Sequence, residues 1–141
     1  MNKKIIGRVD KVDFPKLNLY NVNVKIDTGA YTSTIHCNEY IEENNCLKCS
    51  FNSIGETNIK NNDIIFENYS RTNVKSSNGI MESRYKIKSE IIFFGKTYKI
   101  NLTLSTRSDM KFPVLIGRQF LNKKFLVDVD LENQSYMQRK I

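Results

Sequence analysis

The stretch from residue 24 to residue 30 constrains the fold of this chain more than any other. Apolar and polar side chains alternate over residues 22–26, and this period of two indicates a half-buried β-strand. The strand leads directly into Asp27, Thr28 and Gly29. Because a carboxylate at the end of a buried strand loses water, it must accept hydrogen bonds or shift its pKa. Thr28 and the amides around Gly29 are placed to supply those bonds, and Gly29 can adopt a positive φ and let another chain approach closely.

The remaining sequence predicts many short strands and one short helix. Asn78-Gly79 and Gly95-Lys96 predict the turns of two hairpins, and only residues 118–124 show a helical pattern. The polar residues 38–45 predict a loop or a single helical turn. Regularly spaced short strands without a strand-helix-strand rhythm indicate an all-β barrel. Strands are expected over residues 5–12, 17–26 with a bulge at Tyr20-Asn21, 32–37, 46–54, 64–66, 71–75, 81–94, 98–104, 113–116 and 125–129.

Length and composition predict a single domain over residues 1–141. The chain is 40% hydrophobic, with two prolines, six glycines and no internal repeat, so linkers between domains are not expected. The apolar run near the N-terminus ends at Gly7-Arg8, too early for a secretory segment or a membrane span. We therefore expect a cytoplasmic protein without membrane association, in which Cys37, Cys46 and Cys49 are reduced thiols.

The formal net charge of +7 is spread over the whole sequence. A solvated basic surface is one interpretation, and attraction of an acidic ligand or substrate is another. No helix-turn-helix pattern, zinc finger or aromatic RNA-binding string accompanies the charge, so a nucleic-acid partner is not expected.

The string Asp27-Thr28-Gly29-Ala30 resembles the catalytic loop of aspartic peptidases, and a second string makes the resemblance more specific. Residues 114–121, Val-Leu-Ile-Gly-Arg-Gln-Phe-Leu, are similar to the segment that closes the barrel behind the aspartate in retropepsins. The resemblance implies a closed acid-protease (retropepsin-like) barrel with one short helix near the C-terminus. It also implies an aspartic peptidase with Asp27, Thr28 and Gly29 in its catalytic loop.

The chain resembles more closely a group of small bacterial retropepsin-like proteins labelled ATP-dependent zinc proteases. These proteins are often encoded near ATP-grasp ligases that add glutamate to proteins or peptides, which implies such a ligase as a partner. The resemblance covers most of the chain, through Ile6-Gly7-Arg8, residues 26–36, Asn78-Gly79 with Arg84, Leu102-Thr103-Leu104 with Arg107, and residues 112–128.

A single Asp-Thr-Gly string implies a second chain. Aspartic peptidase chemistry uses two carboxyl groups that share a proton, one acting as base and the other as acid. No other aspartate of this chain is followed by a hydroxyl residue and glycine. We therefore expect Asp27 to meet Asp27 of a second copy across a two-fold axis, with Thr28 bracing the two loops and Gly29 leaving room for substrate. The triplet alone also fits a plain turn, with Asp27 bonded to its own backbone and Gly29 left-handed.

The resemblance implies further substrate-contacting residues, each with a structural alternative. Ala30 and Tyr31 follow the catalytic triplet, and Asn78 and Gly79 form either a flap over the cleft or an ordinary exposed hairpin. His36 matches the group's motif either as a substrate contact or as a hydrogen-bonded structural residue.

Three arginines form another candidate group. In retropepsins the arginine after the glycine pairs with an acidic residue, but Tyr31 occupies that position here. We expect Arg118 to form a structural ion pair with another carboxylate, the alternative being that it binds an acidic group of the substrate. Together with Arg84 and Arg107 it forms a candidate anion-binding set.

The sequence does not predict a metal or a cofactor. It contains no His-Glu-x-x-His string and no phosphate-binding loop for ATP. His36, Cys37, Cys46 and Cys49 offer four ligand types for zinc, but a lone Cys-x-x-Cys spacing on a strand directs its thiols to opposite faces.

The sequence therefore predicts a homodimeric aspartic peptidase that hydrolyses peptide or isopeptide bonds, with glutamate-rich peptides or proteins as candidate substrates. Two other hypotheses remain: a non-catalytic module that binds an acidic peptide, and an interaction subunit of an ATP-grasp ligase system.

Overall fold

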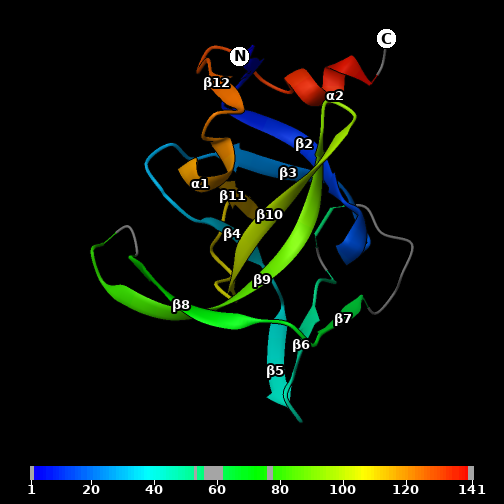
Figure 1. Cartoon of the computed structure of the whole chain (residues 1–141), viewed down its shortest axis with the longest axis vertical. Helices are drawn as coiled ribbons and strands as arrows, with labels where there is room; N and C mark the ends of the chain where they lie inside the picture. The colour runs from blue at the N-terminus through cyan, green and yellow to red at the C-terminus, as the bar shows by residue number, and fades with distance from the viewer. Residues whose placement is uncertain (1, 53, 56–61, 76–77, 140–141) are drawn as a thin grey trace.

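A computed structural model describes residues 2–52, 54–55, 62–75 and 78–139 of the chain (Figure 1). Its fold is mostly β, as predicted. The elements are β1 (Lys4–Ile6), β2 (Val9–Phe14), the 3-10 helix η1 (Pro15–Leu17), β3 (Leu19–Ile26), β4 (Ser33–His36), β5 (Glu39–Glu43), β6 (Cys46–Ser50), β7 (Asp63–Phe66), β8 (Ser70–Lys75), β9 (Met81–Phe93), β10 (Lys96–Ser105), β11 (Val114–Ile116), α1 (Arg118–Leu121), β12 (Phe125–Val127) and α2 (Gln134–Gln138).

Six strands close into the predicted barrel. Neighbouring strands pair in the order β10-β4-β11-β3-β2-β9, and a further pairing of β9 with β10 completes the ring. Strand β8 is the remaining strand of this seven-stranded sheet. Among the described strands it pairs with β9 alone and forms with it a hairpin beside the barrel (Figure 1). Two smaller sheets complete the fold, β1-β12 at one end and β5-β6-β7 at the other.

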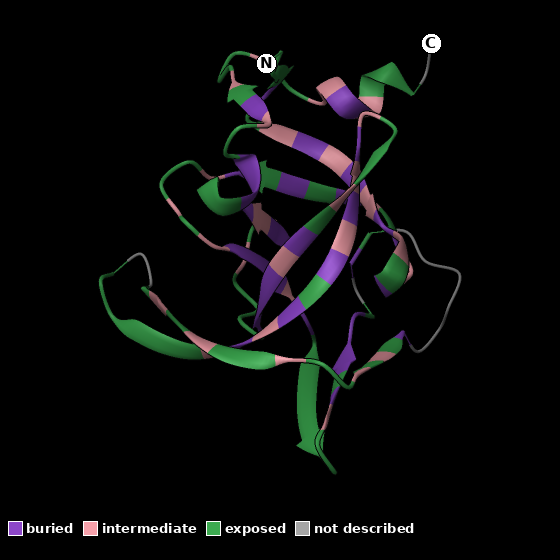
Figure 2. Cartoon of the chain, in the orientation of Figure 1, coloured by how far each residue is buried: buried purple, intermediate pink, exposed green. Residues whose placement is uncertain are grey.

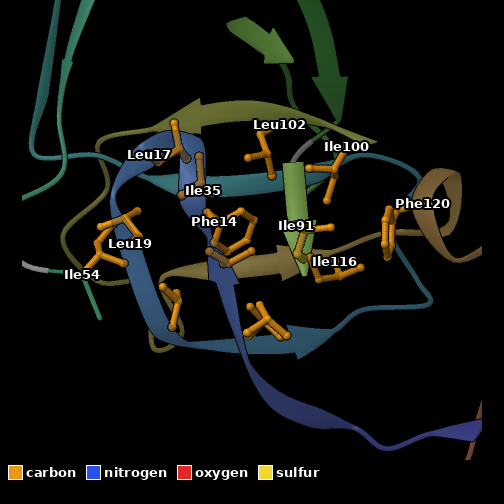
Figure 3. Packing of buried hydrophobic residues seen from close by; sticks show 14 of the residues in the cluster. Phe14, Leu17, Leu19, Ile35, Ile54, Ile91, Ile100, Leu102, Ile116 and Phe120 are labelled. Atoms are coloured by element: carbon orange, nitrogen blue, oxygen red, sulfur yellow. The ribbon is translucent and has the colours of Figure 1, made fainter. Parts of the chain in front are cut away.

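The alternating side chains of the barrel strands fill its interior. In β3 the even-numbered apolar residues 22, 24 and 26 are buried, and the odd-numbered residues between them face outward (Figure 2). Phe14, Leu102 and Ile116 meet inside the barrel, and Phe120 of α1 covers one side of it (Figure 3). Since burial of each large apolar side chain stabilises the fold by roughly 1.5–3 kcal/mol, this core accounts for the barrel.

Both predicted hairpins are present, but their turns differ in detail from those that the sequence predicts. Phe94 and Gly95 connect β9 to β10, both at positive φ (51° and 71°), one residue earlier than the predicted Gly95-Lys96 turn. The predicted hairpin around Asn78-Gly79 joins β8 to β9, but only Gly79 of that pair has a positive φ (86°). The predicted bulge at Tyr20-Asn21 is confirmed, because the register of β2 on β3 shifts between Val12 and Phe14 opposite it.

Three predictions of secondary structure were wrong. Residues 38–45 contain strand β5, which was missed because a strand with five exposed residues lacks the usual alternation. The expected first strand splits at Gly7-Arg8 into β1 and β2, which belong to different sheets. The predicted helix at 118–124 stops at Leu121, and α2 near the C-terminus was not predicted at all. In the part of the chain that the structure describes, neither α-helix has the length and hydrophobicity needed to cross a membrane.

The split of the first strand has a steric cause at Gly7. A Cβ atom at this position would lie 2.1 Å from the backbone oxygen of Leu131, so only glycine lets the C-terminal segment approach. Arg8 continues this contact by donating from Nη1 to the carbonyl oxygen of Val129, at 2.8 Å, and from its backbone nitrogen to Leu131. Gly7 thus ties the C-terminal segment to the barrel.

We expect the substitution Gly7→Ala to lower the free energy of unfolding by about 1–3 kcal/mol, because the new methyl group meets backbone atoms. Urea unfolding followed by tyrosine fluorescence measures this change. Gly95→Asn is the matched control: no atom lies within 4 Å of a Cβ there, and asparagine tolerates positive φ, so its cost stays below about 1 kcal/mol. Equal costs at both positions would contradict this explanation of Gly7.

Candidate functional site

Two parallel strands place Asp27 at the mouth of the barrel. Strand β3 pairs with β11 so that Val24 lies beside Val114 and Ile26 beside Ile116. Directly after this pair, the backbone nitrogen of Asp27 donates to the carbonyl oxygen of Ile116 at 2.8 Å. The carboxylate therefore begins where the buried strand ends, as predicted, and Asp27 itself is half-buried.

The loop after β3 is a compact turn around the Asp27 carboxylate. The side-chain oxygen Oδ1 of Asp27 accepts a hydrogen bond from the backbone nitrogen of Gly29 at 3.2 Å. The backbone carbonyl oxygen of Asp27 accepts one from the backbone nitrogen of Ala30, also at 3.2 Å. Thr28 and Gly29 are exposed at the apex of the loop. Gly29 does not have a positive φ, since the glycines at positive φ in the described residues are Gly55, Gly79 and Gly95, so the left-handed glycine of the plain-turn alternative is not found.

The second sequence string docks directly on this loop. The backbone nitrogen of Arg118 donates to Ala30 at 2.8 Å, and that of Gln119 donates to Tyr31 at 2.9 Å. Gly117 is required between the two segments, because a Cβ at that position would lie 2.4 Å from the carbonyl oxygen of Thr32. The two strings recognised in the sequence therefore form one structural unit.

The side chain of Arg118 does not form the expected ion pair. Its Nη1 donates to the carbonyl oxygen of Thr28 at 3.0 Å, and its guanidinium lies 5.9 Å from the centroid of the Tyr31 ring. Tyr31 occupies the position where retropepsins have an acidic residue, and it presents the face of its ring to Arg118. No carboxylate in the described segments pairs with Arg118. Arg118 thus braces the Asp27 loop and keeps an exposed, uncompensated charge.

A pocket of about 760 Å³ opens above the Asp27 loop. It contains the three candidate arginines, which come from β9, from the segment after β10 and from α1. Their convergence supports the predicted anion-binding set. Asp27 is the only carboxylate among the described residues that line it. The lining consists of Asp27, Gly29, Ala30, Tyr31, Thr32, Thr34, Asn73, Val74, Lys75, Met81, Arg84, Arg107, Leu115 and Arg118.

Two of the arginines already have acidic partners. Arg84 pairs with Glu82 at 2.9 Å, and its Nη1 lies 3.4 Å from the hydroxyl oxygen of Thr34. Arg107 pairs with Asp109 at 3.0 Å through two parallel bonds, which raise the pKa of the guanidinium and lower the pKa of the carboxyl. Arg118 is therefore the arginine of this set whose charge is not offset by a carboxylate in the described structure.

The hairpin of β8 and β9 forms one wall of the pocket. Four of the lining residues belong to it besides Arg84: Asn73, Val74, Lys75 and Met81. Sequence reasoning named the turn, Asn78-Gly79, but missed these strand residues. The available signal was that Lys75 and Met81 flank the predicted turn in the sequence, and the structure pairs them across the hairpin. Asn78 and Gly79 themselves lie outside the described lining, near the exposed tip.

His36 and Thr28 also lie outside the pocket lining. His36 ends β4, where its backbone nitrogen donates to the carbonyl oxygen of Pro113 at 2.7 Å. Its Nδ1 atom is buried without a hydrogen-bond partner among the described residues. The structure therefore does not bring His36 to the pocket.

The cysteines do not assemble with His36 into a metal site in the described part of the chain, where no group of three or more potential ligands is found. Cys37 and Cys49 are buried, and burial raises the pKa of each thiol to about 12. Since zinc binds thiolates, such thiols are poor ligands. Cys46 is half-buried at the start of β6.

Comparisons with known proteins agree with this geometry. Residues 5–139 match a family described as RimB-like, retropepsin-like aspartic endopeptidase RimB. Proteins of Shewanella halifaxensis and Shewanella pealeana, each named probable alpha-L-glutamate ligase, are 34% identical over 131 residues, which cover 90% of this chain. The chain spans only 29% of the length of these relatives.

A solved structure shares the fold. The crystal structure of a protein of unknown function from Legionella pneumophila superposes with a TM-score of 0.72 at 22% identity, covering 95% of this chain and 99% of that one. The match over residues 5–139 includes both sequence strings that build the site. The chain therefore belongs to the RimB-like family of retropepsin-like aspartic endopeptidases.

Proposed function

We propose that this chain is the single-domain subunit of a homodimeric aspartic peptidase that hydrolyses peptide or isopeptide bonds in the cytoplasm. The observation that carries this proposal is a spacious pocket with Asp27 as its only lining carboxylate among the described residues. Because the chemistry requires two carboxyl groups, the second comes from Asp27 of another copy. The three cysteines are unpaired, which fits a reducing compartment.

The exposed apex of the Asp27 loop suits an isologous contact. Thr28 and Gly29 face solvent in one subunit, so the same two residues of a second subunit can meet them across a two-fold axis. Two charged carboxylates ~4 Å apart would repel each other by roughly 4 kcal/mol at an effective dielectric constant of ~20, so they share one proton instead. The ionised carboxyl group then takes a proton from water as the water oxygen bonds to the substrate's carbonyl carbon, and the protonated one donates to the nitrogen as the carbon–nitrogen bond breaks.

The hairpin of β8 and β9 acts as the flap in this proposal. Its residues already line the same pocket as the Asp27 loop, and a lid there excludes water from the reaction. Strand β8 is the edge of its sheet, with an outer side that no described strand occupies. An extended substrate can therefore pair with this edge as an added strand.

The charge of the pocket favours acidic substrates. Arg118 and Lys75 line it without carboxylate partners in the described structure, and the whole chain carries a net charge of +7. Relatives named probable alpha-L-glutamate ligase supply independent support for a glutamate-rich substrate and for a ligase partner. We propose that the enzyme cleaves glutamate-rich peptides or tails and works alongside an ATP-grasp ligase.

A non-catalytic binding module is the second candidate, because one subunit alone holds an anion-binding pocket but only one acid. The two functions differ in their affinity for a mimic of the tetrahedral transition state. A peptidase binds such a mimic at least about 10²-fold more tightly than the matching substrate, whereas a binding module shows no such preference.

We expect Asp27→Asn to lower the rate of peptide cleavage by on the order of 10²–10⁴-fold or more, because amides cannot share and transfer the proton. Mass spectrometry of a glutamate-rich peptide after incubation measures cleavage, and sedimentation analysis shows whether the dimer persists. Asp130→Asn is the matched control, since Asp130 is exposed and lies outside the pocket lining. Undiminished cleavage by the Asp27 variant would remove the catalytic assignment.

We expect Arg118→Gln to raise KM for an acidic peptide by about ten- to a hundredfold, because a charge-assisted contact worth roughly 1.5–3 kcal/mol is lost. Steady-state kinetics at low and high salt measure this effect, which shrinks as salt screens the charge. Lys99→Gln removes the same charge from an exposed position on β10, outside the pocket, and should leave KM nearly unchanged. Equal effects of the two substitutions would show that only net charge matters.

A further inference from the structure

A polar and aromatic cluster lies outside the pocket, between the sheet of β5, β6 and β7 and the hairpin of β8 and β9. Its centre is Glu42 on β5, a strand whose five residues are all exposed. One carboxylate oxygen of Glu42 accepts the hydroxyl of Tyr69 at 2.5 Å, and the other accepts that of Tyr85 at 2.9 Å. Tyr69 immediately precedes β8 and Tyr85 belongs to β9, so a single carboxylate joins both strands of the hairpin to β5.

Aromatic contacts hold the tyrosines in place around this carboxylate. The ring of Tyr85 makes edge contacts with Tyr40, at 5.2 Å between centroids, and with Tyr69, at 5.9 Å. Arg71, the cross-strand partner of Tyr85, lies over its ring at 4.3 Å and also donates to Ser83 at 3.1 Å. The hydroxyl bonds hold the pKa of the Glu42 carboxyl below its usual range and raise the pKa of Tyr69 to about 12.

At the base of the hairpin, two neighbouring residues of β9 contact the pocket and the cluster respectively. Successive side chains of a strand point to opposite faces. Arg84 lines the pocket and contacts Thr34 of the barrel, whereas its neighbour Tyr85 faces Glu42. In the drawing, the hairpin reaches away from the barrel with β5 and β6 beneath its base (Figure 1). A bond to Tyr85 therefore also fixes the strand that presents Arg84 and Met81 to the pocket.

We propose that Glu42 anchors the flap: Glu42, Tyr69 and Tyr85 are positioning residues that set where the β8–β9 hairpin stands over the Asp27 pocket. The inference rests on the proposed function for its kinetic consequence, but the mechanical role stands on the contacts alone. Both bonds of Glu42 lie at the base of the hairpin, one to Tyr69 just before β8 and one to Tyr85 within β9, so the anchor acts where the hairpin leaves the barrel.

Hydrogen–deuterium exchange of the full chain tests the anchor directly. In Glu42→Gln we expect amides of residues 70–75 and 81–86 to exchange on the order of tenfold faster, because two bonds to a charged acceptor are weakened. Amides of β3 and β11 should keep their wild-type rates. Tyr85→Phe and Tyr69→Phe retain their rings and should each produce a smaller change in the same segments. Glu43→Gln, the next residue on the same exposed strand, is the matched control and should change neither region.

Kinetics separate positioning from general destabilisation. A displaced flap raises KM for an acidic peptide by about threefold or more with a smaller change in kcat, whereas partial unfolding lowers the active fraction and leaves KM unchanged. Unaltered hairpin exchange in Glu42→Gln, or equal acceleration in β3 and β11, would overturn the anchor. Because exchange requires no turnover, a loosened hairpin in a protein without peptidase activity would sustain the anchor and overturn only the proposed function.

Discussion

The docking of the Gly117 turn on the Asp27 loop is the contact on which the rest of the site depends. It consists of backbone bonds from Arg118 and Gln119 to the loop, and it exists only because Gly117 has no side chain to hold the two segments apart. Backbone bonds fix position more strictly than long side chains do, since fewer torsions separate the bonded atoms. The carboxylate of Asp27 is therefore presented at a fixed point, which a dyad formed between two subunits requires.

The electrostatics of the pocket are more balanced than its lining suggests. Arg84 and Arg107 each pair with an acid two residues away, so their fields are largely offset. Among the described residues, four cationic side chains line the pocket, those of Lys75, Arg84, Arg107 and Arg118. If none of them were paired, they would favour two ionised Asp27 carboxylates in a dimer and would oppose the sharing of one proton. By pairing two arginines locally, the chain keeps a positive pocket while limiting the field at Asp27, as the proposed proton-sharing pair requires.

The sequence was most informative where local pattern and packing agree. The alternation of β3 located a barrel strand because it depends on the strand alone, and the two strings around Asp27 and Gly117 located the site because together they resemble a known family, although the contacts that join them are long-range. It failed at β5, whose exposed residues carry no alternation, and at the partner of Arg118, which is a backbone carbonyl and has no side-chain signature. The convergence of Arg84, Arg107 and Arg118 needed the folded barrel, because three separate segments supply them.

Strand β9 explains why elements outside the barrel can influence the pocket. Residues 81–86 pair with β8 in the hairpin, and residues 86–93 pair with β10 in the barrel wall, so one continuous strand belongs to both. A strand that is rigid at its barrel end transmits any constraint at Tyr85 to Arg84 and Met81 with little loss, since these residues lie only one and four positions before it in the chain. The three-stranded sheet that carries Glu42 adds little to the barrel core beyond β6, yet it contacts this strand at the point where the barrel ends and the hairpin begins. Its position is the one that the proposed anchoring of the hairpin by Glu42 requires.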